Sequence, residues 1–388
     1  MVDVAEIVRT YDLGCLTVGS LGGHSALDVC SGAKAQGFWT VVVAKRGREK
    51  TYVDYFRSRP NTYHLTPIIS QKGCVDETIL VDEFQDVLRE DVQEQLRQRN
   101  TIMVQSRYFW TYMDAPLQIP QEFRVPLFGP RFLLKLEDRA QPYGQYHLLR
   151  DAGIRVPKIF VRPQDIDRPA LVKASEKQRH YERGFFLVRN AEEYEETGSR
   201  LAREGKIAVD WRNAQIEEFV VGAPVNFHFF SSPLTGELEL LGTDTRRQTN
   251  LDGLLRMTAD QQIRTRGMFD VTMVEAGHMA CTVKESLLEK AFDLGATFVT
   301  QCRKLSKEID PSGKGMIGPF ALQGAIVGEG GKEDIVMFDV SFRIPGSPGI
   351  TATPYAGYLY GRPVSMGERI AMELRQAIEE GRVAEVVT

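Results

Sequence analysis

The chain is poor in cysteine, with five in 388 residues. Their number is odd, their positions are scattered and none lies in CxxC spacing, so we expect neither a disulfide framework nor a zinc site. Reduced thiols of this kind are typical of a cytosolic protein, and we expect a cytoplasmic location. The cysteines are Cys15, Cys30, Cys74, Cys281 and Cys302.

Long hydrophobic runs are also missing. No stretch reaches the about 18 apolar residues that a membrane helix needs. Residues 1–10 carry acids and lack the apolar core of a signal peptide. We therefore expect no leader and no membrane partner. With 43% hydrophobic and 26% charged residues, the composition is that of an ordinary globular protein, and the length suits about two or three domains.

The chain has no surplus of positive charge, because 48 Lys and Arg face 52 Asp and Glu, for a net charge of −4. Sequence-independent binding to a nucleic-acid polymer needs such a surplus, so we expect no polymer partner. A local basic pocket for one small phosphate ester is still allowed.

Several familiar catalytic motifs are absent from the sequence, namely Walker A, the GxSxG elbow and HExxH. Gly19–His24 follows a strand and opens a helix, which suits anion binding by backbone N–H groups. The segment is not GxGxxG, and Ala44-Lys45 stands where a dinucleotide-binding dehydrogenase carries an acid. The sequence therefore disfavours a dinucleotide-dependent dehydrogenase. His24 is a candidate for contact with a phosphate or reacting group, with a capping or packed histidine as the alternative.

Short apolar strands alternate with helices in the first part of the chain, which favours βαβ units and a parallel sheet. We expect an amphipathic helix over 83–99, and prolines between 116 and 130 mark a domain edge. A helix over 138–152 that ends at Gly153 then leads into a small α+β lobe. We therefore predict three domains, with bounds 1–130, 131–222 and 223–388.

A hairpin over 319–343 is the most informative pattern. Its two strands meet at a glycine-rich turn, which brings Gln323 opposite Asp339, with side chains about 5 Å apart. The period of two places Ser341 and Arg343 on the same face as Asp339. Paired oxygens beside a cation suit Mg²⁺ that holds a polyphosphate. A solvated polar face is the alternative.

Two further segments have features of a nucleotide slot. Glu217-Glu218 leads into an apolar strand and Gly222, which would supply an acid for the ribose hydroxyls and a slot for the base. Lys173 ends an apolar strand ahead of a charged loop, where it can reach a phosphate as a point charge. An exposed strand start and a solvated lysine are the alternatives.

The polar run 242–253 contains two arginines and shows no apolar period. Such a loop is costly to order unless it binds something, and arginine pairs suit phosphate because they form bidentate hydrogen bonds. The run predicts a ligand-binding loop, with an ordinary surface loop as the alternative.

Taken together, these segments resemble an ATP-grasp enzyme. More narrowly, the chain is similar to the formate-dependent 5-formaminoimidazole-4-carboxamide ribonucleotide (FAICAR) synthetase family of archaeal purine biosynthesis, over about residues 12–380. The segments that carry the narrower likeness are 21–25, 246–254, 318–323 and 338–341.

The resemblance implies a three-domain ATP-grasp fold, α/β and α+β, with an N-terminal parallel α/β domain and ATP between the second and third domains. It implies a ligase in which ATP, formate and aminoimidazole-carboxamide ribonucleotide (AICAR) give ADP, phosphate and FAICAR through formyl phosphate. The implied cofactors are ATP and Mg²⁺, with Mn²⁺ as an alternative ion. The partners are these small molecules, and a homo-oligomer is allowed.

Site residues follow from the same resemblance. His24 and Asn250 would contact the ribonucleotide, and Gln323 and Asp339 would hold the metal. We add two catalytic partners for phosphate or formate, Arg246 and Arg343. The residues expected to line the ATP slot are Lys173, Glu217, Glu218 and Val220.

Three departures from the family leave alternatives open. Tyr108 stands where the family has a serine that touches the ribonucleotide, and its ring can reject the usual ligand. The segment 174–184 has one glycine where some members are glycine-rich, and Asp339 replaces a glutamate of some relatives. The alternatives are an ATP-grasp carboxylate–amine ligase for a different carboxylate or amine, and a non-catalytic nucleotide-binding regulator. The retained Lys173, Gln323, Asp339 and Arg343 disfavour the regulator.

Overall fold

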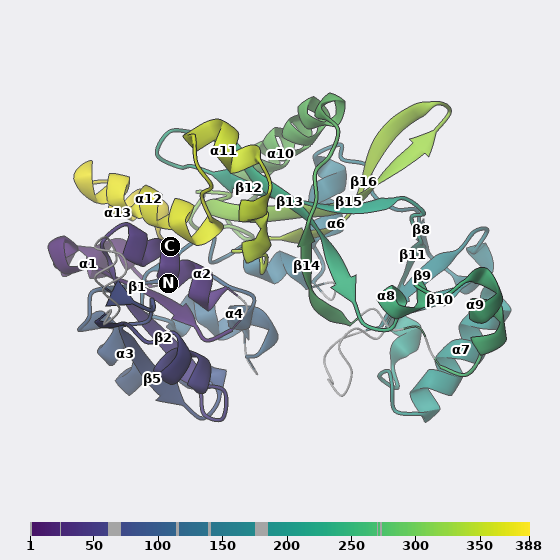
Figure 1. Cartoon of the computed structure of the whole chain (residues 1–388), viewed down its shortest axis with the longest axis horizontal. Helices are drawn as coiled ribbons and strands as arrows, with labels where there is room; N and C mark the ends of the chain where they lie inside the picture. Colours follow the sequence, from purple (N-terminus) through teal and green to yellow (C-terminus); the bar gives the residue numbers. More distant parts are fainter. Residues whose placement is uncertain are drawn as a thin grey trace.

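The computed structural model describes residues 2–23, 25–60, 71–113, 116–138, 141–174, 185–269, 271 and 274–388. Among these residues, no helix is both long and apolar enough to cross a membrane. The strands form a five-stranded parallel sheet and two antiparallel sheets of four and five strands, which lie in three parts of the molecule (Figure 1), and a small two-stranded sheet.

The N-terminal part is built on a parallel sheet, as the sequence predicts. It has five strands in the order β5-β2-β1-β6-β7. The predicted helix over 83–99 is instead two pieces, a 3₁₀ helix Phe84–Leu88 and α3 Glu90–Arg97. The extended backbone of Arg89 separates them. The strands are β1 Thr17–Leu21, β2 Trp39–Lys45, β5 Glu77–Val81, β6 Thr101–Val104 and β7 Leu127–Phe128.

The small lobe holds a four-stranded antiparallel sheet in the order β10-β9-β11-β8. Its core gathers Trp211, Tyr194 and Phe186 between the sheet and α7 Ala191–Arg203. The helix that leads into it, α6 Gln145–Asp151, is shorter than predicted. Gly153 follows its C-cap residue Ala152 with a φ of 71°, as expected for a helix-ending glycine. The strands are β8 Ile159–Phe160, β9 Ala170–Lys173, β10 Phe185–Val188 and β11 Gln215–Glu218.

A five-stranded antiparallel sheet, β14-β13-β12-β15-β16, forms the centre of the C-terminal part. Helix α10 Leu288–Arg303 packs on one face through stacked phenylalanines such as Phe298 and Phe320. The predicted pairing of Gln323 with Asp339 is confirmed residue for residue. The strands are β12 Ala223–Ser231, β13 Leu238–Gln248, β14 Glu275–Ala280, β15 Gly318–Glu329 and β16 Lys332–Ser341.

The prediction that 242–253 is a loop is wrong for its first half, because β13 continues to Gln248. Its side chains have no apolar period because Asp244 and Arg246 pair with polar groups on neighbouring strands. After the strand, the chain forms α8 Leu251–Leu254 and α9 Ala259–Thr265 before it returns along β14.

The C-terminal helix α12 Met366–Glu379 packs against α2 Ala26–Ala35 and so joins the C-terminal part to the N-terminal sheet (Figure 1). The helices touch at two glycines: a Cβ on Gly32 would lie 2.1 Å from the Glu368 backbone nitrogen. The Gly367 N–H donates to Asp28 Oδ2 at 3.0 Å. Shorter elements complete the chain, namely α1 Val4–Arg9, β3 Arg59–Pro60, β4 Gln71–Lys72, α4 Tyr108–Thr111, α5 Ile119–Glu122, α11 Tyr355–Tyr360 and α13 Val383–Val386.

Candidate functional site

A cavity of about 1100 Å³ is lined by residues from all three parts of the molecule. The small lobe contributes an apolar side, which includes Leu171, Phe185 and Phe219. The polar face of the central sheet and the segment after β6 line the rest. The cavity brings together seven of the predicted site residues: Lys173, Glu217, Glu218, Val220, Arg246, Asp339 and Arg343.

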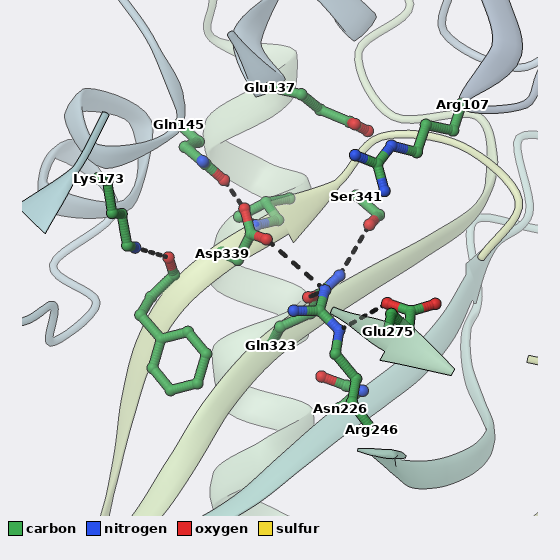
Figure 2. Close-up of polar contacts among 12 residues, drawn as sticks. Arg107, Glu137, Gln145, Lys173, Asn226, Arg246, Glu275, Gln323, Asp339 and Ser341 are labelled. Carbon is green, nitrogen blue, oxygen red and sulfur yellow. Dashed lines mark hydrogen bonds and ion pairs between the residues drawn. The ribbon is translucent and has the colours of Figure 1, made fainter. Parts of the chain in front are cut away.

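Lys173 and Glu217 form a buried ion pair in the cavity wall, with side chains only 4% and 3% exposed. The Tyr146 hydroxyl lies 2.7 Å from Glu217 Oε2, and Lys173 Nζ donates to that hydroxyl at 3.3 Å. Lys173 also reaches the Phe338 carbonyl oxygen, as Figure 2 shows. Glu217 therefore fixes the position of the lysine, whereas Glu218 lies further out and accepts a hydrogen bond from Arg168 at 3.3 Å.

Arg246 reaches from β13 across the sheet to both predicted metal ligands (Figure 2). It donates to Gln323 Oε1, and its Nη2 lies 3.7 Å from Asp339 Oδ2. Gln323 in turn donates to Ser341 Oγ at 2.8 Å. An amide oxygen opposite a carboxylate is a donor set that suits Mg²⁺. Because the guanidinium lies at these oxygens, an incoming ion must displace it from Gln323.

No cluster of three or more His, Cys, Asp or Glu suitable for a metal occurs in the part of the chain that the structure describes. The predicted pair, Gln323 and Asp339, would give a metal ion two protein ligands. A magnesium ion commonly has few protein ligands and completes its shell with water and substrate phosphates. The residues present fit an ion that arrives with a nucleotide.

A buried polar network supports Arg246 from behind. Glu275 lies 3.3 Å from Arg246 Nε through one carboxylate oxygen and 2.9 Å from His278 Nε2 through the other. His278 Nδ1 lies 2.8 Å from Asp244, which His228 and Asn226 also contact, at 3.1 and 2.6 Å. Burial alone would raise the pKa of Asp244, but the hydrogen bonds from His228 and His278 hold it far below its usual value. Burial opposes the charge on His278, yet the two carboxylates raise its pKa to about 9.

This network predicts a pH-dependent contribution to stability from His278. Since its pKa rises from about 6.5 to about 9, the stabilisation is complete below pH 6.5 and is lost as the pH rises through 9. The difference in unfolding free energy between the wild type and His278→Gln should be on the order of 3 kcal/mol at pH 6 and shrink by pH 9.5. Denaturant unfolding at both pH values measures this difference. A constant difference across the range would contradict the assignment, and Glu275→Gln should flatten the profile.

Arg343 pairs with a buried glutamate that the sequence analysis missed. Glu137 accepts a hydrogen bond from the Phe342 N–H at 2.8 Å and lies 3.4 Å from Arg343 Nε. Burial raises the pKa of Glu137, and the Arg343 charge opposes that rise. Both residues line the cavity. Glu137 has no recognisable motif around it, since it reaches the site only because the chain before α6 folds against β16.

The predicted ribonucleotide contacts lie beside the cavity or outside the described residues. His24 and 175–184 belong to the undescribed part. The Tyr108 ring packs on the loop after β1, where a Cβ on Gly23 would lie 2.2 Å from its Cζ. Asn250 is exposed and begins α8 with φ 40°. Neither is among the described residues that line the cavity, although their neighbours Arg107 and Leu251 are.

Solved structures with the same architecture define the class. The chain is similar to an IMP biosynthesis protein PurP from Thermococcus kodakaraensis, with 27% identity and a TM-score of 0.66, over 96% of this chain and 100% of that one. An ADP complex of N5-carboxyaminoimidazole ribonucleotide synthetase matches at 12% identity and a TM-score of 0.54, over 91% of this chain and 78% of that one. The fold is therefore an ATP-grasp fold, as the sequence predicts.

Comparisons of sequence identify the family. Two families described as "Domain of unknown function (DUF1297)" and "Protein of unknown function (DUF1246)" match residues 193–388 and 18–160. A relative from Methanopyrus kandleri is 38% identical and one from Methanocaldococcus jannaschii 34% identical, each over 100% of this chain and 99% of its own length. Both are named 5-formaminoimidazole-4-carboxamide-1-(beta)-D-ribofuranosyl 5'-monophosphate synthetase. The chain belongs to this synthetase family, which confirms the resemblance seen in the sequence.

Proposed function

We propose that the protein is an ATP- and formate-dependent ligase that converts AICAR to FAICAR in purine biosynthesis. The observation that carries the proposal is the cavity, in which Lys173, Arg246, Arg343 and Asp339 converge from separate elements. The full-length identity to synthetases of this name supports the choice of substrates.

The chemistry requires that formate be activated. Formate is a poor acyl donor because oxide is a poor leaving group. A formate oxygen therefore attacks the γ-phosphorus of ATP, and ADP leaves. The 5-amino nitrogen of AICAR then attacks the carbon of formyl phosphate, the C–O bond to phosphate breaks, and the proton that the nitrogen loses leaves with the phosphate. Both steps depend mainly on positioning and charge neutralisation.

The residues that line the cavity, with Gln323 beside it, can supply these functions. The ammonium of Lys173 offers a point charge to a phosphate of ATP. Arg246 and Arg343 offer planar donors to the transferred phosphoryl group and to formate. Gln323 and Asp339 would hold Mg²⁺, which neutralises phosphate oxygens when bound. The apolar side formed by the small lobe, with Glu218 and Val220 at its edge, would hold the nucleoside of ATP.

The role of Lys173 leads to a prediction with two variants. Lys173→Met should leave Glu217 charged and unpaired in the protein interior, at a cost of about 3–5 kcal/mol in stability. The double variant Lys173→Met/Glu217→Gln removes both charges and should recover most of that stability. Both variants should bind ATP more weakly than the wild type, because both lack the Lys173 ammonium. Thermal unfolding measures the stability of the two proteins, and ATP titration measures their affinity. ATP binding by the double variant at the wild-type level would show that Lys173 does not contact ATP.

The function itself is tested by substrate omission. Phosphate release should require ATP, formate and AICAR together, with FAICAR formed in equal amount. Release that needs ATP and AICAR but a carboxylate other than formate would reject the proposal. Absence of any turnover together with ATP binding would instead favour the regulator.

One observation favours a second candidate, a ligase for a different amine. The Tyr108 ring fills the space beside Gly23, where the resemblance places a serine. It packs against Tyr112 in a tilted arrangement, with 4.4 Å between the ring centroids. A ring at this point can exclude the usual ligand. Phosphate release with ATP, formate and another amine, but not with AICAR, would establish this candidate.

The remaining predictions from the sequence are consistent with this function and stay predictions. They are the three domain bounds, the contact of His24 and Asn250 with the ribonucleotide, the choice of Mg²⁺ or Mn²⁺, a homo-oligomer and a cytoplasmic location.

A further inference from the structure

Arg107 is an arginine of the cavity to which the sequence analysis gave no role. It lies between β6 and α4 in the N-terminal part and lines the cavity beside Trp110 and Tyr112. Its Nε donates to Thr111 Oγ1 at 3.1 Å, within the same segment, which orients the guanidinium. The N-terminal part thus supplies a cation and aromatic rings to a cavity whose other walls come from the rest of the chain.

Arg107 faces two polar side chains that also lie beside the other cavity arginines. Glu137 lies beside Arg343, and Ser341 lies beside Arg246. Figure 2 shows its guanidinium directed toward Glu137 and Ser341, with Arg246 on the other side of Ser341. Burial lowers the pKa of Arg343, the charges of Glu137 and Asp339 oppose that shift, and the charges of Arg107 and Arg246 add to it. Three guanidinium groups thus lie near one another in this part of the cavity, together with the carboxylates of Glu137 and Asp339.

We propose that Arg107 binds the phosphate monoester of the nucleotide co-substrate, an inference that rests on the proposed function. A guanidinium matches a phosphate by two parallel hydrogen bonds. A phosphate monoester carries about two negative charges, so it attracts a guanidinium more strongly than singly charged formate does.

The position of Arg107 distinguishes between the anions of the reaction. Arg246 contacts Gln323 and Asp339, at the end of the cavity where the predicted metal and phosphoryl transfer belong. Arg107 lies on the other side of Ser341, in the N-terminal part, next to Tyr108 and the loop that contains Gly23. The ribonucleotide is the substrate expected on that side, so its phosphate is the group for Arg107.

Binding of two ligands that differ only in the phosphate tests the inference. The wild type, Arg107→Gln and Arg107→Lys are titrated calorimetrically with AICAR and with the riboside that lacks the phosphate, in the absence of ATP and formate. Arg107→Gln should weaken AICAR binding about 10- to 100-fold and riboside binding less than about 2-fold. Arg107→Lys should recover part of the loss, because it keeps the charge without the planar donor pair. The matched control is Arg89→Gln, an exposed arginine paired with Asp91, which should bind both ligands like the wild type.

Each alternative outcome has a definite meaning. An equal loss for AICAR and riboside, no loss for either, or a selective rise in the KM for formate would overturn the inference. These outcomes leave the proposed function intact if the wild type still forms FAICAR. Wild-type protein that binds AICAR through Arg107 but forms no FAICAR would support the inference and overturn the function.

Discussion

Asp339→Asn is expected to lower kcat by about 10³-fold or more while the protein stays folded. The substitution keeps the size of the side chain on β16 and removes the one carboxylate of the predicted metal pair. It also removes the charge that lies 3.7 Å from Arg246 Nη2. Without it, an Mg²⁺ ion loses its anionic ligand, and the polyphosphate loses its neutralising partner. Steady-state kinetics over a range of Mg²⁺ concentrations measure both effects.

A matched control lies on the same strand. Asp334 pairs with Lys290 and Arg155 and is not a residue of the cavity wall. Asp334→Asn should leave kcat within about 2-fold of the wild type, because paired surface charges contribute little. An Asp339→Asn enzyme that turns over at the wild-type rate, with the wild-type dependence on Mg²⁺, would disprove the metal assignment.

Gly32→Ala is expected to lower the free energy of unfolding by about 3 kcal/mol. The added Cβ would lie 2.1 Å from the Glu368 backbone nitrogen and 2.2 Å from the Gly367 carbonyl carbon. Backbone cannot move aside as a flexible side chain can, so α2 and α12 must separate and lose the packing of their neighbours. Thermal unfolding should show a Tm lower by roughly 4 °C, because the unfolding entropy of a chain of this length is large.

Gly357→Ala on α11 is the matched control, since it makes the same change within another helix. A Cβ there meets nothing within 4 Å. The variant should be as stable as the wild type or gain about 0.5–1 kcal/mol, because alanine loses less backbone entropy than glycine in a helix. Equal stability of the two variants would show that the helix contact does not hold the two parts together.

The part of the site that could be predicted from sequence is the part that local pattern determines. The hairpin turn sets the register of Gln323 and Asp339, because a period of two and a glycine turn leave little freedom. The apolar runs at β1 and β2 likewise predict a buried parallel sheet.

The rest depends on contacts between distant segments. The sequence predicts a loop from residue 242 onward, where β13 in fact continues. The polar side chains of β13 satisfy one another across the sheet, so no hydrophobic period marks the strand. Arg107 and Glu137 reach the cavity from elements far from β16 in the chain, and no motif surrounds either. His278 and Glu275 support Arg246 only because β14 returns beside β13 after an excursion through α8 and α9.

Transfer of ¹⁸O from formate tests the central claim most directly. Doubly labelled formate, ATP and AICAR are incubated with the protein, and the released phosphate and FAICAR are analysed by mass spectrometry. Activation as formyl phosphate predicts one ¹⁸O in each phosphate and one retained in each formyl group, because the bridging oxygen leaves with phosphorus. FAICAR formation with unlabelled phosphate would contradict the account.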